Sequence, residues 1–330
     1  MRLFIPLLLS LLLPAAAPAA AEPLRFAAFG DMPYCNRGGA EACAAELARV
    51  EQLTEAINAA RPAFSIFLGD TKAGGEACSD AIILDRTAAW FNRIRGPLVY
   101  TPGDNEWTDC WQPRAGGFDP VERLGLLRAR FFSAPVSLGQ APMPLRRQSD
   151  LDPGFRAYPE NARWERDGIT FLTLHVPGSD NNRPQDGRPG TPPGAAQEYP
   201  ARNAANLAWL RQGFAAARAS GSRAVVVAMQ ADMYFRDRCG RGAVAGHVDT
   251  RNALAAAARD FGRPVLLLHG DGHFWLRDNP MPEAPNLTRV MVPGDGDTRA
   301  VVVTIDPAAS EPYRFEIVGP ADRIAAPGCD

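Results

Sequence analysis

Lysine is almost absent from this sequence, since only Lys72 among its 35 basic residues is a lysine. Codon bias accounts for the missing lysines, because alanine, glycine, proline and arginine are all abundant, but it leaves open why one lysine stands at position 72. The chain also lacks an excess of charge of either sign, with a formal net charge of -2. Binding to nucleic acid through a basic surface needs an excess of positive charge. We therefore expect no nucleic-acid partner.

Long apolar runs are missing after the first 21 residues. Residues 1–21 combine a positive start at Arg2, an apolar run over 4–13 and small residues over 19–21, ahead of Glu22. This pattern is typical of a cleaved secretory signal, and its apolar run is shorter than the roughly 20 residues of a membrane span. We expect an exported protein, periplasmic or extracellular, without stable membrane insertion.

No Cys-x-x-Cys spacing occurs among the six cysteines, which argues against a zinc knuckle. An even number of cysteines in an exported chain favours disulfide bonds, although six thiols allow fifteen pairings. Because they lie in neighbouring predicted loops or at the C-terminus, we expect the pairs Cys35–Cys43, Cys78–Cys110 and Cys239–Cys329. Each such bond typically contributes ~2–4 kcal/mol to stability.

Short apolar runs predict buried strands, and helical patterns lie between them. The runs span residues 24–29, 63–68, 98–101, 224–229 and 264–268. Uniformly apolar strands that alternate with helices predict a parallel sheet covered on both faces. The composition is globular, with 46% hydrophobic and 22% charged residues. With no internal repeat and no linker, it favours one large α/β sandwich domain over residues 22–330.

The C-terminal part predicts a closing antiparallel set of strands over residues 290–292, 300–305 and 313–318. Between the first two of these runs lies Gly294-Asp295-Gly296-Asp297. This segment is predicted to be a hairpin turn; a calcium-binding loop is the alternative.

Polar side chains recur directly after the buried strands. They are Asp31, Asp70, Asp104, Asn105, Glu106, Gln230, Asp232, His269, Asp271 and His273. In α/β sheets the crevice beyond the carboxyl ends of the strands is where ligands bind. Turn formation alone would explain one Gly-Asp pair, but not its repetition after successive strands. The pattern predicts a ligand site rich in oxygen donors, of the kind that binds hard cations.

These motifs resemble the calcineurin-like metallophosphoesterases, over about residues 26–275. That family carries Asp-x-His, Gly-Asp, Gly-Asn-His-Asp/Glu, a histidine and Gly-His-x-His after successive strands. The counterparts here are Asp31-Met32-Pro33, Gly69-Asp70, Gly103-Asp104-Asn105-Glu106, Gln230 and Gly270-Asp271-Gly272-His273. The resemblance implies a layered αββα sandwich, a divalent metal centre and hydrolysis of a phosphate ester by metal-activated water.

The chain departs from the family at several ligand positions. Pro33 replaces the first histidine, and Asn105 replaces the histidine that protonates the leaving group. Gln230 and Asp271 replace two more histidines, and Asp104 replaces the asparagine. The metal ligands that the resemblance leaves are Asp31, Asp70, Asp104, Gln230, Asp271 and His273. Such a set favours magnesium, manganese or calcium over zinc, and it leaves open whether one or two ions bind.

Three residues are candidates for catalysis. Asn105 occupies the position of the family's proton donor. Lys72 lies two residues beyond Asp70 and either supplies a positive charge in place of a second metal or is a solvated loop residue. His269 ends the fifth strand and is either a proton donor or a structural histidine, and the same alternatives hold for His175.

We therefore expect a metal-dependent phosphoesterase acting on a small-molecule or other phosphoester substrate. The absence of a Gly-x-Ser-x-Gly motif disfavours a serine hydrolase. Two alternatives stay open. One is a catalytically silent relative that binds a ligand or partner in the bacterial envelope, and the other is a hydrolase of a different bond that uses one metal.

Overall fold

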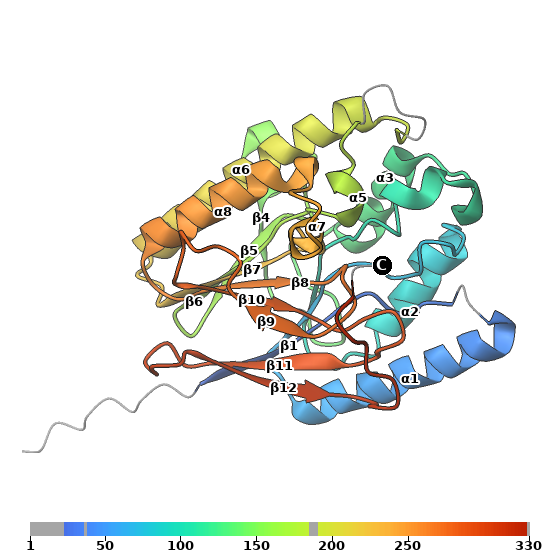
Figure 1. The fold of residues 1–330 in the computed structure, drawn as a ribbon, viewed down its shortest axis with the longest axis horizontal. Helices are drawn as coiled ribbons and strands as arrows, with labels where there is room; N and C mark the ends of the chain where they lie inside the picture. Colours follow the sequence, from blue (N-terminus) through green and yellow to red (C-terminus); the bar gives the residue numbers. More distant parts are fainter. Residues whose placement is uncertain (1–22, 36–37, 185–190, 329–330) are drawn as a thin grey trace, which may run out of the picture.

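The computed structural model describes residues 23–35, 38–184 and 191–328. It shows an α/β fold with two mixed β-sheets and helices on their outer faces (Figure 1), which is compatible with the expected α/β sandwich. The predicted signal segment over 1–21 lies outside the described residues, as does Cys329 of the third expected disulfide.

The first sheet has five strands in the order β12-β11-β1-β2-β3. The bounds are β1 (Leu24–Phe29), β2 (Ser65–Phe67), β3 (Leu98–Tyr100), β11 (Ala300–Ile305) and β12 (Tyr313–Val318). Strands β1, β2 and β3 are parallel, so their carboxyl ends lie at one edge of the sheet. Strands β11 and β12 extend the other side as an antiparallel pair.

The second sheet has seven strands in the order β4-β5-β6-β7-β8-β10-β9. The bounds are β4 (Arg146–Arg147), β5 (Ala162–Arg166), β6 (Ile169–Thr173), β7 (Ala224–Ala228), β8 (Val265–His269), β9 (Leu276–Asp278) and β10 (Leu287–Met291). Strands β6, β7, β8 and β10 are parallel. Strands β5 and β6 form a hairpin whose turn residues, Asp167 and Gly168, both have positive φ, as a two-residue hairpin requires.

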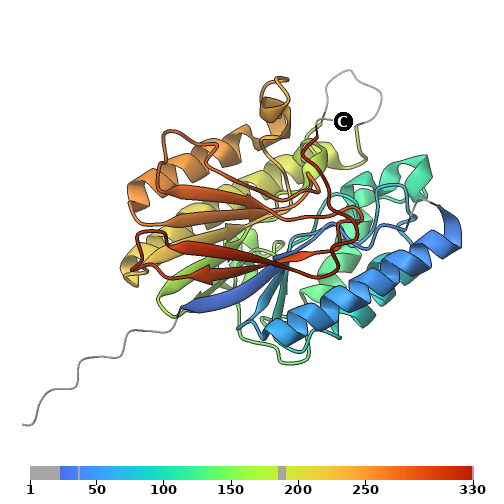
Figure 2. The ribbon, with the colours of Figure 1, turned by 60° about the horizontal axis from the view of Figure 1, so that its bottom comes forward.

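Helices cover the outer face of each sheet. The bounds are α1 (Gly39–Ala60), α2 (Thr87–Phe91), α3 (Pro120–Phe131), α4 (Gln148–Leu151), α5 (Gly178–Asn181), α6 (Ala195–Ala219), α7 (Phe235–Arg238) and α8 (Val248–Phe261). Helices α6 and α8 lie against the seven-stranded sheet and α1 against the five-stranded sheet (Figure 2). The Asp119 side chain caps α3 by accepting hydrogen bonds from the N–H groups of Val121 and Glu122.

The alternation of side chains along β1 shows how the layers pack. Phe26 and Ala28 point into the core between the two sheets, whereas Ala27 and Phe29 point into the core under α1 and α2. Because both faces are buried, the strand is apolar at almost every position. The sheets are therefore held together by one apolar layer, with a further apolar layer beneath the helices on each side.

The expected closing antiparallel set is wrong in one respect. Strand β10 belongs to the seven-stranded sheet and runs parallel to β8, whereas β11 and β12 pair antiparallel in the other sheet. The segment 294–297 is therefore not a hairpin turn, because it carries the chain from one sheet to the other.

Two of the expected disulfide bonds, Cys35–Cys43 and Cys78–Cys110, are confirmed. Among the described cysteines none is a free thiol. Disulfide bonds persist in oxidising compartments, so these pairs are compatible with an exported protein. None of the helices within the described ranges combines the length and apolar character that a membrane span requires.

Candidate functional site

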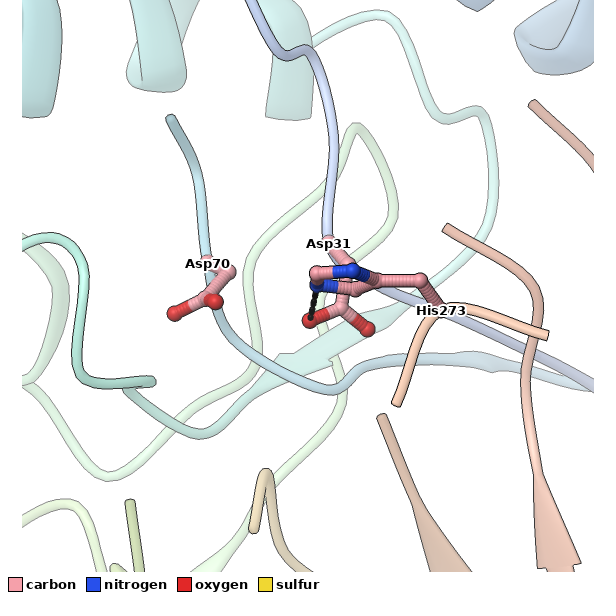
Figure 3. A group of neighbouring side chains, drawn as sticks. All are labelled: Asp31, Asp70 and His273. Atoms are coloured by element: carbon pink, nitrogen blue, oxygen red, sulfur yellow. Dashed lines mark ion pairs between the residues drawn. The ribbon is translucent and has the colours of Figure 1, made fainter. Parts of the chain in front are cut away.

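The ends of three strands bring two carboxylates and an imidazole together. Asp31 follows β1, Asp70 follows β2, and His273 lies four residues after the end of β8. One ligand atom from each lies within 4.8 Å of the others (Figure 3). All three residues have positive φ, of 55°, 60° and 66°. The chain thus turns sharply out of each strand and places these side chains toward one another, as the strand-end pattern predicts.

Glycines let the neighbouring strand ends approach these carboxylates. A Cβ atom on Gly103 would collide with the Asp70 carboxylate, and one on Gly270 would collide with that of Asp31. The Gly-Asp pairs therefore have a packing role as well as a turning role, because a larger residue would displace the carboxylates.

Asp70 lies at the centre of a hydrogen-bond network. Asn105 donates to both of its carboxylate oxygens, from its backbone N–H at 3.1 Å and from its side-chain amide at 2.7 Å. The Tyr34 hydroxyl also donates to Asp70, at 2.9 Å. The fully buried Glu106 accepts from the N–H groups of Asp70 and Gly103 and so holds the two turns together.

Asp31 and His273 form the other side of this group. The Asp31 carboxylate is fully buried and accepts a hydrogen bond from the N–H of Asp271 at 3.0 Å. The Nε2 atom of His273 lies 3.7 Å from Asp31 Oδ1, while the imidazole is 33% exposed. His273 is therefore the member of the group that faces solvent most.

Asp104, Gln230 and Asp271 form a second polar group beside the first. The side-chain amide of Gln230 donates to Asp104 Oδ1 at 3.0 Å, and its oxygen accepts from the N–H of Gly178 at 2.5 Å. Asp271 Oδ2 accepts from the N–H of Asp232 at 2.9 Å. The structure thus brings all six predicted ligands into one region, but only Asp31, Asp70 and His273 form the compact group.

Burial and mutual repulsion act on these carboxylates. Burial raises the pKa of Asp31 and Asp70 well above their ordinary values, and repulsion from Asp271 and Asp104 respectively adds to it. The pKa of Asp271 is raised by burial and by Asp104. A cation among these groups would offset both effects. The oxygen-rich donor set of Asp31, Asp70 and His273 fits a divalent cation.

Lys72 is fully buried, so the solvated-loop alternative for this residue is wrong. Its ammonium donates to the carbonyl oxygen of Ala73 at 2.9 Å. Burial lowers the Lys72 pKa, while the nearby Glu106 and Asp70 carboxylates oppose that shift. The one lysine of the chain therefore places its charge beside the acidic groups.

The other candidate histidines lie deeper in the protein. His269 is buried, its Nδ1 lies 2.9 Å from the carbonyl oxygen of Gly270, and burial lowers its pKa to about 4. His175 is buried with its Nδ1 2.8 Å from Glu160, and burial lowers its pKa to about 4 as well. Both are neutral near pH 7, and a role for His269 in proton transfer stays a prediction.

Two residues of the site were missed by sequence reasoning. The Tyr34 hydroxyl contacts Asp70, Asn105 and, at 3.3 Å, His273 Nε2. Asp295 donates its N–H to the Asp31 carbonyl and lies 3.9 Å from His273 Nδ1. For Asp295 the signal was available, since it belongs to a further Gly-Asp pair after a strand. No comparable signal pointed to Tyr34.

A cavity of about 700 Å³ opens beside the site. Its polar lining includes Asp104, Ser179, Asp180, Asp232, Asp271 and His273. Phe235, Val244 and Phe274 provide an apolar part. The volume lies within the range typical of small-molecule sites.

Comparison of the chain with models of protein families found none that matches, and no curated protein matches it.

Proposed function

We propose that this chain is a metal-dependent phosphoesterase of the calcineurin-like metallophosphoesterase type. The observation that carries the proposal is the compact group of Asp31, Asp70 and His273 beside a cavity of small-molecule size. The two-sheet α/β sandwich and the order of the strand-end motifs support it. The two disulfide bonds support the accompanying proposal of a periplasmic or extracellular location.

The first-choice ligands of the metal are Asp31, Asp70 and His273. Asp104, Gln230 and Asp271 lie beside this group but outside it, and the hydrogen bonds from Gly178 to Gln230 and from Gln230 to Asp104 already engage two of them. When bound, a divalent cation would supply Lewis-acid activation of water and of a phosphoryl oxygen. Magnesium, manganese or calcium suits these oxygen donors better than zinc does.

The remaining residues hold the ligands in place and balance their charge. Asn105 fixes both oxygens of Asp70, so its role is orientation, because an amide has no acidic proton to give a leaving group. Glu106 fixes the turns that carry Asp70 and Gly103. Lys72 contributes the positive charge of a buried ammonium next to these carboxylates.

The test is hydrolysis of p-nitrophenyl phosphate and bis-p-nitrophenyl phosphate by the purified mature protein with manganese supplied. We expect turnover that requires the metal and that falls by at least about a hundredfold in Asp31→Asn. A folded, manganese-loaded protein that hydrolyses neither ester would contradict the proposal for simple phosphate esters.

The second candidate function is a catalytically silent ligand- or partner-binding protein. The observation that favours it is Asn105, which stands where the family has its proton donor, together with the Gln230–Asp104 hydrogen bond in place of further metal ligands. Metal binding without hydrolysis across a panel of phosphate, carboxylic and sulfate esters would support this function. Hydrolysis of a non-phosphate ester would support a one-metal hydrolase of another bond.

A further inference from the structure

The short segment α5 (Gly178–Asn181) is a left-handed turn and not a regular helix, and it forms one wall of the cavity beside the site. The four successive residues Ser179, Asp180, Asn181 and Asn182 have φ values of 46°, 53°, 58° and 56°. None of them is glycine, and residues with a side chain adopt this conformation in succession only where their surroundings enforce it. Contacts from outside the turn must therefore hold it.

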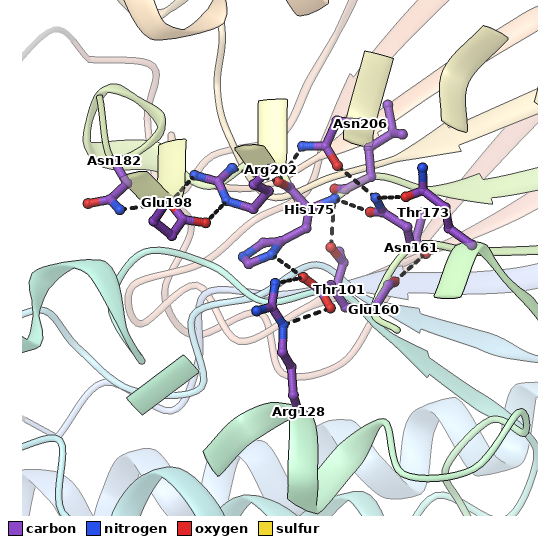
Figure 4. A network of polar contacts seen from close by, with 12 residues as sticks. Thr101, Arg128, Glu160, Asn161, Thr173, His175, Asn182, Glu198, Arg202 and Asn206 are labelled. Carbon is purple, nitrogen blue, oxygen red and sulfur yellow. Dashed lines mark hydrogen bonds and ion pairs between the residues drawn. The ribbon is translucent and has the colours of Figure 1, made fainter. Parts of the chain in front are cut away.

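Arg202 of α6 provides two of these contacts, both to Asn181. Its guanidinium, drawn near His175 and Glu198 in Figure 4, is fully buried and donates to the His175 carbonyl at 2.9 Å. It also donates to the Asn181 side-chain oxygen at 2.5 Å and to the Asn181 carbonyl at 2.9 Å. Two further bonds, at 2.6 and 3.0 Å, go to Glu198. All five N–H donors of the guanidinium are thereby used. Glu198 in turn accepts from the Asn182 side chain at 2.8 Å.

Arg202 also contacts the segment that follows Asp104. The guanidinium lies over the ring of the fully buried Trp107, 5.3 Å from its centroid. The backbone N–H of Trp107 donates to the carbonyl oxygen of Asp104 at 3.3 Å. One buried side chain thus joins the left-handed turn to the loop that carries a candidate ligand.

The turn contacts the site directly. The Ser179 hydroxyl lies 2.7 Å from Asp104 Oδ2, and the N–H of Gly178 holds the Gln230 side chain. A Cβ atom on Gly178 would lie 2.8 Å from Asp271 Oδ1 and 3.0 Å from Asp104 Oδ1, so only glycine lets the turn approach this closely. Ser179 and Asp180 line the cavity together with these two carboxylates.

We propose that Arg202 is a positioning residue that fixes the left-handed turn 179–182 as the substrate-contacting wall of the site. Ser179 and Asp180 then contact the part of the substrate beyond its phosphoryl group. The contact with substrate rests on the proposed phosphoesterase function, whereas the positioning of the turn does not. The compact group of Asp31, Asp70 and His273 makes no contact with Arg202, so its affinity for a cation should be independent of it.

The test replaces Arg202 with lysine, which keeps the charge but has three donors around one point in place of a planar fork. In Arg202→Lys we expect KM for p-nitrophenyl phosphate to rise about tenfold, with kcat changed less than about threefold. Amide hydrogen exchange in residues 176–183 should accelerate about tenfold or more. Manganese affinity, measured by calorimetry, should stay within about twofold.

Two further variants separate positioning from general damage. Arg211→Lys changes an exposed arginine on the same helix and should behave as wild type in every measurement. Asn181→Gly keeps the left-handed conformation accessible while deleting the side chain that Arg202 and Gly246 hold, so it should reproduce the KM and exchange effects without altering α6.

Unchanged KM and exchange in folded Arg202→Lys and Asn181→Gly would overturn the proposal, as would a loss of manganese affinity equal to the rise in KM. If the wild-type protein hydrolyses no phosphate ester, the proposed function fails on its own. Faster exchange of the turn at unchanged manganese affinity would still support the positioning role of Arg202, and unchanged exchange would overturn it.

Discussion

At the scale of single residues, the site gathers buried carboxylates that few positive groups balance. Asp31, Asp70 and Asp271 repel one another in a region from which water is largely excluded. Lys72 is the buried ammonium beside them, and His273 adds an imidazole at the solvent side. Such an arrangement is costly unless a cation completes it. The repulsion between the buried carboxylates and the oxygen donors that they offer therefore both favour a bound divalent cation.

Lys72 gives the first prediction at this scale. Arginine is larger, planar and more weakly hydrated than the lysine ammonium, and Lys72 is fully buried. Lys72→Arg should therefore lower phosphoester turnover about tenfold or more, equivalent to roughly 1.4 kcal/mol. Lys72→Met should cost more, because it removes the charge. Steady-state kinetics at saturating manganese measures both effects, and equal activity in all three proteins would show that the charge at position 72 has no role.

His175 gives a prediction about pH and stability. Burial lowers its pKa from 6.5 to about 4 although Glu160 opposes this, so between those pH values the unfolded chain binds a proton that the folded protein does not. Stability is complete above about pH 6.5 and falls as the pH decreases through this window, by about 2 kcal/mol at pH 5 from this group alone.

Urea unfolding at pH 7 and pH 5 measures this effect. The difference in free energy of unfolding between the two pH values should be about 2 kcal/mol smaller in His175→Gln than in the wild type. An identical difference in the two proteins would mean that His175 is not buried in its neutral form.

Sequence reasoning at this scale succeeded where residue type and position both carried information. Asp31 and Asp70 follow the parallel strands β1 and β2, which bring their ends to one edge of a sheet, and His273 follows β8 of the other sheet. Tyr34 escaped it because tyrosine after Pro33 carries no ligand signature, and its approach to Asp70 depends on how the chain folds back after β1. For Lys72 the sequence could not show whether the side chain is buried or exposed, because a loop has no periodic pattern that separates the two.

At the scale of elements, the disulfide Cys78–Cys110 links the loops that follow β2 and β3, which carry Asp70 and Asn105. It closes a segment with a sequence separation of 32, against 8 for Cys35–Cys43. Because longer closed loops restrict the unfolded chain more, we expect losses of about 3.7 and about 2.5 kcal/mol when each bond is removed.

The double variants Cys78→Ser/Cys110→Ser and Cys35→Ser/Cys43→Ser test this order. The free energy of unfolding, measured with denaturant, should be lower in the Cys78/Cys110 variant than in the Cys35/Cys43 variant. Manganese affinity should also fall more in the Cys78/Cys110 variant, because the loops that this bond joins carry Asp70 and Asn105. The reverse order in both measurements would contradict the view that Cys78–Cys110 supports the site.

The positions of the strands could be predicted from the sequence, whereas their pairing could not. The apolar runs located β1, β7 and β8 closely, because strands buried on both faces are apolar throughout. The same uniformity hid which sheet each strand joins. Strand β10 pairs with β8 and β11 pairs with β1, so the connection through Asp295 crosses between the sheets and reaches the site. Long-range pairing of this kind has no local pattern.

At the scale of the whole molecule, the strand and helix pattern predicted an α/β sandwich, and only the family resemblance implied two sheets; neither predicted that both sheets are mixed or how their strands are ordered. The number of apolar strands and helices limits the layers that can be built, but pairing depends on contacts between distant segments. The predicted signal segment and the Cys239–Cys329 pair stay predictions.

The oxidation state of the cysteines is a property of the whole chain. An exported protein should hold its cysteines as disulfides, and two bonds are present in the structure. Thiol titration of the denatured, unreduced mature protein should find close to zero free thiols. A count of two free thiols would contradict the predicted Cys239–Cys329 bond, and a count of four or more would contradict at least one bond that the structure describes.

The central claim is that Asp31, Asp70 and His273 hold a divalent cation, and the binding of manganese to the purified protein tests it most directly. Calorimetry with the wild type, Asp70→Asn and the exposed control Asp85→Asn should show binding in the first and third proteins. In Asp70→Asn the affinity should fall at least about a hundredfold, while the melting temperature of the metal-free protein is unchanged or higher, because one of several repelling carboxylates is removed. Equal manganese affinity in wild type and folded Asp70→Asn would contradict the account.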